Sequence, residues 1–386
     1  MSKYSGNGCE EKPIMAKIAF CLISHTAHVR HLVPVAIAYA ELTNDRVDIL
    51  ISSEAVLVEF NQVVNELSSS NFNVIFLKGG WFKTLIGKLK GRHYPNIKNV
   101  INNNKKRFLA YDCLVTPHHN LDRVMELDHL NKIKYVCTFH GAGDGEIGFD
   151  KRFSFYDLLL VSGQDIKNRL CDAGIVHKSN QVELVGYPKL EMLTKRVPED
   201  LGFDVSTPVV LYNPHYAKSL TSWYQDGIEI LEWFSKHPDY NLIFAPHVKL
   251  FYGPVPAEVM SYADYNNIII DCGGSRSTDA TYSQVADIYI GDVSSQVYES
   301  LYFSPKPLIF INSHGVQWQG DPNYKMWQLG QVVNDIAELE DKLDNIKNNR
   351  FLYSKEQILA IESKFSKFDV GAANTSANQI HQFLHS

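Results

Sequence analysis

The sequence predicts an α/β protein made of two doubly wound domains that face each other across a cleft. Short apolar runs, typical of buried parallel strands, alternate with helix-like segments along the whole chain. This alternation starts again near residue 207, after a polar, proline-containing stretch at 194–208 that we interpret as a linker. The length of 386 residues also suits two domains of ordinary size.

The first half is expected to form a Rossmann-like domain over residues 15–193, preceded by a disordered polar tail at 1–14. A helix is expected over 32–43, where the apolar positions fall on one face. Strands are expected at 17–23, 47–52, 72–77, 113–116, 134–139, 157–162 and 181–186.

The second half is expected to form a nucleotide-binding Rossmann-like domain over residues 209–365, with a helix at 227–237. The segment 366–386 is expected to be a helix that crosses back to the first domain. Strands are expected at 207–214, 240–247, 267–271, 286–292 and 306–312.

Composition narrows the class of protein. The formal net charge of −6 gives no overall attraction to nucleic acid, so we expect no nucleic-acid partner. The six cysteines are scattered without a CxxC pair, which disfavours structural zinc and a disulfide framework. No apolar run approaches the roughly 18 residues of a membrane span. We expect a cytoplasmic protein, either free or peripheral on the inner face of the membrane.

Two common nucleotide-binding motifs are missing from the sequence. "SHTAHVRHL" stands after the first strand, where an ordinary dinucleotide fold has Gly-x-Gly-x-x-Gly. A Gly-Lys-Ser/Thr phosphate loop does not occur either. Dehydrogenases and P-loop NTPases are therefore disfavoured, and the cleft at the carboxyl ends of both sheets is the expected ligand site.

The stretch "GDVSSQVYES" places Ser294 and Ser295 where a strand gives way to a helix. Unpaired N–H groups and the helix dipole make such a position an anion site, although a serine there often only caps the helix. The second serine favours phosphate binding. Glu299, one turn further on, is within reach of a ribose hydroxyl, with a solvated or helix-supporting role as the alternative.

Three further groups of residues follow predicted strands. His140 enters a glycine-rich turn that also holds Asp144 and Glu146, and a histidine there can accept a proton near neutral pH. His247 with Lys249, and His215 with Lys218, follow strands of the second domain, where they would neutralise a diphosphate.

His25 and His28 lie in the first strand-to-helix turn and are interpreted as acceptor or nucleotide contacts. As metal ligands they need a third partner, for which "TPHHN" at 116–120 offers histidines. We expect no metal and no cofactor.

Residues 78–107 carry nine Lys or Arg and no acid, with apolar residues interleaved. Such a run is usually a solvated face. Here it also fits contact with an anionic polymer or an anionic lipid surface.

The order of these motifs resembles the CDP-glycerol glycerophosphotransferase family of teichoic acid and capsule polymerases, which have a GT-B fold. The likeness spans roughly residues 130 to 315. It rests on His140-Gly141 after a strand, "GYPKLEML" (186–193), "VVLYNP", a histidine after "LIFAP", and "ADIYIGDVSSQVYESLYFSPKPLIFIN" (286–312). Departures from the family pattern are Ala142 for Thr, Lys189 for Arg, Glu191 for Asp, the inverted pair Pro246-His247, and no Thr-x-Arg in "YNPHYAK".

The resemblance implies a metal-independent transferase that moves a glycerol-phosphate or related polyol-phosphate unit from a CDP-linked donor to an acceptor hydroxyl, releasing CMP. His140 would deprotonate a lipid-linked or polymeric acceptor, and His247, Ser294 and Ser295 would hold the donor phosphates. The alternatives are a glycosyltransferase using a CMP- or UDP-linked sugar, with Asp144 or Glu146 as base, a nucleotide-sugar 2-epimerase, and a non-catalytic GT-B module.

Overall fold

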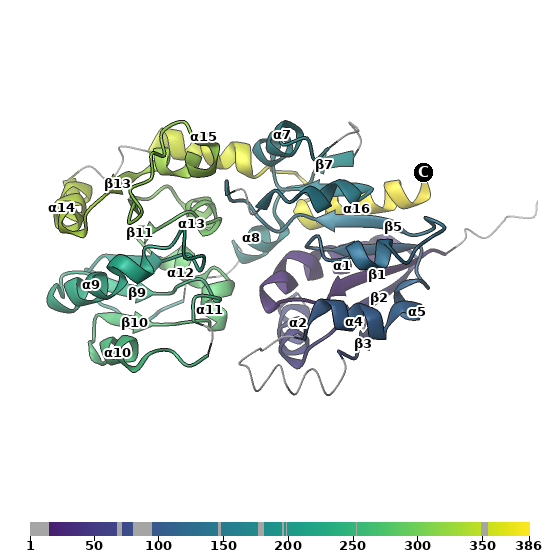
Figure 1. Ribbon diagram of the computed structural model, residues 1–386, viewed down its shortest axis with the longest axis horizontal. Helices are drawn as coiled ribbons and strands as arrows, with labels where there is room; N and C mark the ends of the chain where they lie inside the picture. Colours follow the sequence, from purple (N-terminus) through teal and green to yellow (C-terminus); the bar gives the residue numbers. More distant parts are fainter. Residues whose placement is uncertain are drawn as a thin grey trace, which may run out of the picture.

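The computed structural model describes residues 15–67, 72–79, 95–145, 148–176, 181–194, 197, 199–251, 253–348 and 354–386. Two parallel sheets, each covered by helices, lie side by side and face one another (Figure 1). This arrangement confirms the predicted fold class.

The first sheet has the strand order β3-β2-β1-β4-β5-β6-β7, and every recorded pairing is parallel. Its strands are β1 (Lys17–Leu22), β2 (Arg46–Ile51), β3 (Asn73–Phe76), β4 (Cys113–Thr116), β5 (Lys134–Thr138), β6 (Leu158–Val161) and β7 (Val182–Leu184). Its helices are η1 (Thr26–His28), α1 (Val29–Leu42), α2 (Glu54–Glu66), α4 (Ile97–Asn103), α5 (Lys105–Phe108), α6 (Asp122–Met125), η3 (Lys151–Phe155), α7 (Gln164–Asp172) and α8 (Pro188–Leu193).

The second sheet has the order β10-β9-β8-β11-β12-β13. Its strands are β8 (Val209–Asn213), β9 (Asn241–Phe244), β10 (Ile268–Ile270), β11 (Ile288–Gly291), β12 (Leu308–Ile311) and β13 (Gln331–Val333). Its helices are α9 (Trp223–Lys236), α10 (Ala257–Met260), η5 (Ser261–Asp264), α11 (Ser275–Thr278), α12 (Thr281–Val285), α13 (Gln296–Phe303), η6 (Pro322–Leu329), η7 (Ile336–Glu338) and α14 (Leu339–Asn348). Every expected strand occurs, and the described residues add β13, which the sequence analysis did not predict.

The chain returns to the first domain after the second. Helix α15 (Ser354–Lys364) contacts both α13 and α7, and α16 (Ala372–His385) packs along α1. Ala377 and Ile380 of α16 belong to the same buried cluster as the apolar face of α1. In Figure 1 this last helix, in yellow, lies against the first domain.

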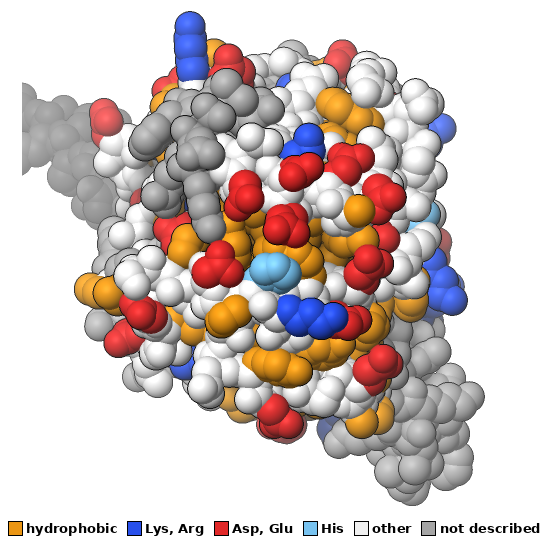
Figure 2. Space-filling model, turned by 90° about the vertical axis from the view of Figure 1, so that its left-hand side faces the viewer, with side chains coloured by type: hydrophobic (Ala, Val, Ile, Leu, Met, Phe, Trp, Pro, Cys, Tyr) orange, Lys and Arg blue, Asp and Glu red, His pale blue; other side chains and the backbone are white. Residues whose placement is uncertain are grey.

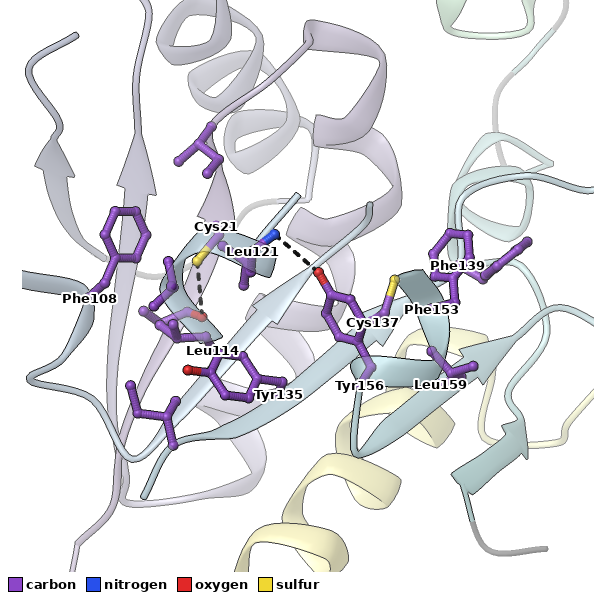
Figure 3. Close-up of a cluster of buried hydrophobic side chains, with 14 of the residues drawn as sticks. Cys21, Phe108, Leu114, Leu121, Tyr135, Cys137, Phe139, Phe153, Tyr156 and Leu159 are labelled. Atoms are coloured by element: carbon purple, nitrogen blue, oxygen red, sulfur yellow. Dashed lines mark hydrogen bonds between the residues drawn. The ribbon is translucent and has the colours of Figure 1, made fainter. Parts of the chain in front are cut away.

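The first core contains two of the cysteines that the sequence placed in apolar strands. Cys21 and Cys137 lie in one cluster with Phe153 and Tyr156 (Figure 3), and burial raises the pKa of both thiols. Tyr156 also accepts a hydrogen bond from the amide of Leu121 at 3.3 Å and thereby fixes the loop that follows β4. These cysteines are packing residues.

The far end of the second domain is acidic. Figure 2 looks onto this end and shows many Asp and Glu side chains, few Lys or Arg, and scattered exposed hydrophobic groups. The helices there, α9 and α14, carry much of this charge in "WYQDGIEILEWFSK" and "LEDKLDNIKN". This end therefore repels polyanions, in keeping with the net charge of the chain.

No helix in the described ranges is long and apolar enough to cross a membrane.

Candidate active site

A cavity of about 560 Å³ lies where the loops that follow the strands of both sheets meet. The first domain contributes the loop after β4 and the glycine-rich loop after β5. The second domain contributes loops after β8, β9 and β11 and the start of η6. The lining includes His118, His119, His140, Gly141, Gly143, Gly145, His215, Tyr216, Ser219, His247, Lys249, Val293, Ser294, Ser295, Asp321, Asn323 and Tyr324.

His140 follows β5 and lines the cavity, and the one hydrogen bond recorded for its ring within the described residues is made by Nδ1. Its Nδ1 lies 2.5 Å from the carbonyl oxygen of Pro117. Because a carbonyl only accepts, Nδ1 carries the proton and Nε2 of the neutral ring is an acceptor. Burial lowers the pKa of His140 to about 4, so the ring is neutral at pH 7. A neutral imidazole with an open Nε2 in a cavity has the properties of a general base.

His215 and His247 have the opposite proton arrangement. Nδ1 of His215 accepts from the amide of Ala217 at 3.0 Å, and Nδ1 of His247 accepts from the amide of Lys249 at 3.1 Å. The proton of each neutral ring is therefore on Nε2. Burial lowers the pKa of His215 to about 4 and that of His247 to about 3. The two rings, 5.7 Å apart, are paired N–H donors suited to an anion.

Lys249 supplies positive charge beside these rings. Its Nζ lies 5.2 Å from the ring centre of Tyr216, a cation–π contact. Burial lowers its pKa. Of the described residues that line the cavity, Lys249 alone is a Lys or Arg.

Ser294 and Ser295 line the cavity at the start of α13, as the sequence pattern predicts. The Ser294 hydroxyl accepts from the amide of Gln296 at 3.2 Å, whereas Ser295 makes no side-chain cap to the helix. A Cβ built on Gly143 would lie 3.2 Å from the Ser295 nitrogen. The glycine-rich loop of the first domain thus rests on the helix start of the second, and Ser294 partly satisfies the helix itself.

Asp144 does not face the cavity, which corrects its interpretation as a base. It is buried and bonded by the Tyr298 hydroxyl at 2.6 Å, the Met326 amide at 3.0 Å and Lys364 Nζ at 2.5 Å. All three contacts tie the carboxylate to neighbouring elements rather than to the cavity. Asp144 instead joins the glycine-rich loop to α13, η6 and α15.

Glu299 is also turned away from the cavity, against the expectation of a ribose contact. Its carboxylate accepts from Lys189 Nζ at 2.6 Å and from the Tyr187 hydroxyl at 3.0 Å. The same hydroxyl lies 2.8 Å from the carbonyl oxygen of His140. Lys189 and Glu299 therefore pair with each other, and Tyr187 links this pair to the loop that carries His140.

His25 and His28 are not among the described residues that line the cavity. Nδ1 of His25 accepts from the Ala27 amide at 3.2 Å, and Nδ1 of His28 lies 2.6 Å from the Ser24 hydroxyl. The His28 ring centre is 4.5 Å from that of His140. His28 thus packs against His140, whereas His25 lies close enough to Lys249 for that charge to add to burial in lowering its pKa to about 4.

His118 and His119, which the sequence offered only as spare metal ligands, line the first-domain side of the cavity. The His118 ring stacks 5.2 Å from that of His140, and His119 Nε2 lies 3.6 Å from Asp150. Burial lowers the pKa of both histidines, to about 2 for His118 and about 4 for His119. Adjacent histidines after a buried strand were the signal that could have found them.

Asp292, the acid of "GDVSS", was not predicted as a functional residue. Its Oδ2 accepts from the amides of His215 at 2.8 Å and Ser222 at 3.1 Å, so it fixes the loop that carries His215. The side chain is fully buried, and desolvation raises its pKa to about 7.

Two sequence predictions cannot be placed. Glu146 and residues 80–94 of the basic segment lie outside the described residues. The described remainder of that segment includes α4, whose Val100 and Ile101 are buried in the first core. Lys218, which was predicted to act with His215, is not among the described residues that line the cavity. Its Nζ lies 5.6 Å from the ring centre of Tyr224.

The fold and the cavity together define a two-domain GT-B protein whose histidine-lined cavity lies between the two sheets. Residues 93–385 match the family described as CDP-Glycerol:Poly(glycerophosphate) glycerophosphotransferase. The chain belongs to this family of transferases. A comparison with curated proteins finds no match.

Solved structures show the same fold at low identity. The wall teichoic acid polymerase TagF aligns with a TM-score of 0.60 and 12% identity over 96% of this chain and 87% of its own. MnaA of S. aureus, in complex with UDP, aligns with a TM-score of 0.61 and 11% identity over 95% of this chain and 97% of its own. A protein from Listeria monocytogenes that is described as a UDP-N-acetylglucosamine 2-epimerase aligns with a TM-score of 0.62 and 11% identity over 95% of both chains.

Proposed function

We propose that this protein transfers a polyol-phosphate unit, such as glycerol phosphate, from a CDP-linked donor to an acceptor hydroxyl with release of CMP. The observation that carries the proposal is the contrast between histidines across one cavity. His140 offers a lone pair, whereas His215 and His247 offer N–H groups. A reaction that removes a proton beside a phosphate needs both.

In the proposed step, the acceptor oxygen attacks the β-phosphorus of the donor and passes its proton to Nε2 of His140. The bond from that phosphorus to the bridging oxygen breaks, and CMP leaves with the electron pair. Lys249 and the Nε2–H groups of His215 and His247 bind the phosphate oxygens as charge shifts onto the leaving group. The proposal adds the N-terminus of α13 at Ser294 and Ser295 to these donors and includes no metal ion.

Family membership and the related structures support this choice of donor. The family is described by transfer from CDP-glycerol, and structures of TagF include soaks with CDPG. In the proposal, cytidine sits over the second domain, and the lipid-linked or polymeric acceptor enters past His118 and His119. We place the protein in the cytoplasm, at the inner membrane face, with the segment 78–107 as its contact to anionic lipid or polymer.

A sugar transferase is the second candidate, and one observation favours it. A diphosphate donor is usually met by several cations, but Lys249 is the one Lys or Arg among the described lining residues. A CMP-linked sugar, with a single phosphodiester, carries less charge. In that version the attack is at the anomeric carbon and CMP again leaves.

The test is to incubate the protein with CDP-glycerol, a CMP-sugar or a UDP-sugar, plus a hydroxyl acceptor, and to identify the products by mass spectrometry. We expect CMP and an acceptor heavier by one glycerol phosphate. An acceptor heavier by a sugar would establish the second candidate. Conversion of the sugar of the UDP-sugar to its epimer, without transfer to the acceptor, would indicate an epimerase. No turnover and no thermal shift with any nucleotide would indicate a non-catalytic module.

A further inference from the structure

A cluster of three potential metal ligands lies away from the cavity, where α16 crosses the first domain. Asp45 comes from the turn between α1 and β2, and His381 and His385 come from α16. One ligand atom from each residue lies within 4.8 Å of the other two. The two histidines are four residues apart in a helix, so they share a face. The fold thus unites residues that are more than 330 positions apart.

The histidine rings are arranged toward each other and toward the carboxylate. Their ring centres are 4.5 Å apart, and His385 Nε2 lies 2.9 Å from Asp45 Oδ2. Nδ1 of His381 is buried and has no hydrogen-bond partner among the described residues. A simple His385–Asp45 ion pair would not account for His381, whose buried nitrogen is left without a partner.

The carboxylate is held in place by groups behind it. The Tyr39 hydroxyl donates to Asp45 Oδ2 at 2.6 Å, and the amide of Ala16 donates to Oδ1 at 2.9 Å. Such outer hydrogen bonds, which orient a ligand before a metal arrives, are typical of metal sites in proteins.

We propose that Asp45, His381 and His385 bind one zinc ion, with water as the fourth ligand. Two imidazoles and a carboxylate form a ligand set that zinc accepts. Ligand atoms about 2.0–2.2 Å from a tetrahedral zinc lie roughly 3.4 Å apart, so none of these atoms moves by more than about 1.4 Å relative to its neighbours. The ion joins α16 to the first domain.

This site is structural and independent of the proposed transferase reaction. It lies at the α1–α16 contact, whereas the cavity lies between the two sheets. Zinc at this position strengthens the attachment of a helix whose Ala377 and Ile380 complete the first core.

The test uses the full chain without a histidine tag, stripped with a chelator and titrated with Zn²⁺ at pH 7.5 against a chromophoric competitor. We expect one zinc bound at this site and a rise of several degrees in the melting temperature. The variants His381→Ala and His385→Gln should each weaken this binding at least tenfold. His385 is exposed, so its variant retains the fold, which circular dichroism of the metal-free protein checks.

The matched control is His140→Ala, which removes a histidine from the cavity histidine group and should bind this zinc as the wild type does. The proposal is overturned if wild-type protein binds no stoichiometric zinc. It is also overturned if the bound zinc is lost in His140→Ala and retained in the two α16 variants, because the ion would then occupy the cavity. Zinc in the cavity would also contradict the metal-independent reaction proposed above, whereas the absence of bound zinc would leave that reaction unaffected.

Discussion

Lys189 and Glu299 form a buried ion pair between the two domains, with 2.6 Å between Nζ and Oε2 and side chains only 7% and 6% exposed. Lys189 lies on α8 and Glu299 on α13, the helix that begins beside Ser295. Through Tyr187, the same carboxylate is linked to the carbonyl of His140. The pair therefore links the loop that carries His140 to the helix that begins beside Ser295.

Removing one partner should destabilise the protein strongly. Lys189→Met leaves Glu299 buried and uncompensated, at a cost of about 3–5 kcal/mol in the free energy of unfolding, measured by urea titration. The control is Lys236→Met, which breaks the exposed pair with Glu232 and should leave the free energy of unfolding near that of the wild type. Unchanged stability with a raised Michaelis constant for the donor would restore the predicted ribose contact of Glu299.

Replacing the base should separate turnover from binding. His140→Ala should lower kcat about 10²–10⁴-fold, the usual contribution of a general base, while nucleotide affinity from calorimetry stays near that of the wild type. His129→Ala, at an exposed histidine, is the matched control. A variant that kept full turnover would show that another group takes the proton.

The value of kcat/KM should fall at low pH, where His140 becomes protonated. Only the neutral His140 ring accepts a proton, and burial lowers its pKa to about 4. We therefore expect kcat/KM to be independent of pH between 6 and 8 through this group, and to fall about tenfold per unit below about pH 4. An acidic limb near pH 6.5 would mean that the ring is solvated in the working enzyme.

The serines should act on the donor. Ser294→Ala/Ser295→Ala removes two hydroxyls that line the cavity, and losing hydrogen bonds to a charged phosphate costs about 1.5–3 kcal/mol. The Michaelis constant for the donor should rise by more than about tenfold, with kcat less affected. Ser304→Ala, at the exposed end of the same helix, should change neither.

Acid should destabilise the protein through its buried histidines. In the folded state, burial lowers the pKa of His215 to about 4 and of His247 to about 3, so between those values and about 6.5 the unfolded chain binds more protons. Stability is then lost as pH falls from 7 to 5, by about 1–2 kcal/mol per histidine. Urea titrations at both pH values should show a smaller loss in His215→Asn/His247→Asn. An equal loss in that variant would mean that other groups dominate.

Asp292 should change the pH dependence of stability in the opposite direction, because it destabilises the folded protein as the pH rises. Burial raises its pKa from 3.8 to about 7 in the folded state, so its contribution to stability is fully present only below about pH 4. Part of it is already lost at pH 5, and more is lost between pH 5 and 8. Between these values, Asp292→Asn should gain about 2–3 kcal/mol relative to the wild type. Parallel stability curves for the two proteins would show that the carboxyl ionises normally.

The sequence predicted the fold and the main lining of the cavity because both depend on local patterns. Apolar runs mark parallel strands, and parallel strands bring their carboxyl ends to one cleft, which locates His140, His247 and Ser294 without a structure. The proton positions on the histidines were not predictable, because they depend on which backbone group each Nδ1 meets.

The roles of Asp144 and Glu299 could not be predicted for a different reason. Each stands in a loop or helix that suits a site residue, but the partner that neutralises it is distant in sequence. Lys364 is 220 residues from Asp144, and Lys189 is 110 residues from Glu299. Charge pairing over such separations leaves no periodic signal.

The return of α16 to the first domain sets the order in which the protein is completed during synthesis. Residues 15–193 emerge from the ribosome first, yet Ala377 and Ile380 belong to their core, and Lys134 donates to the carbonyl of Phe383 at 2.7 Å. At about 5–20 residues per second, α16 follows roughly 10–40 s later. Until then, the apolar face of α1 lacks the helix that covers it, so the first domain to be made is the last to be finished.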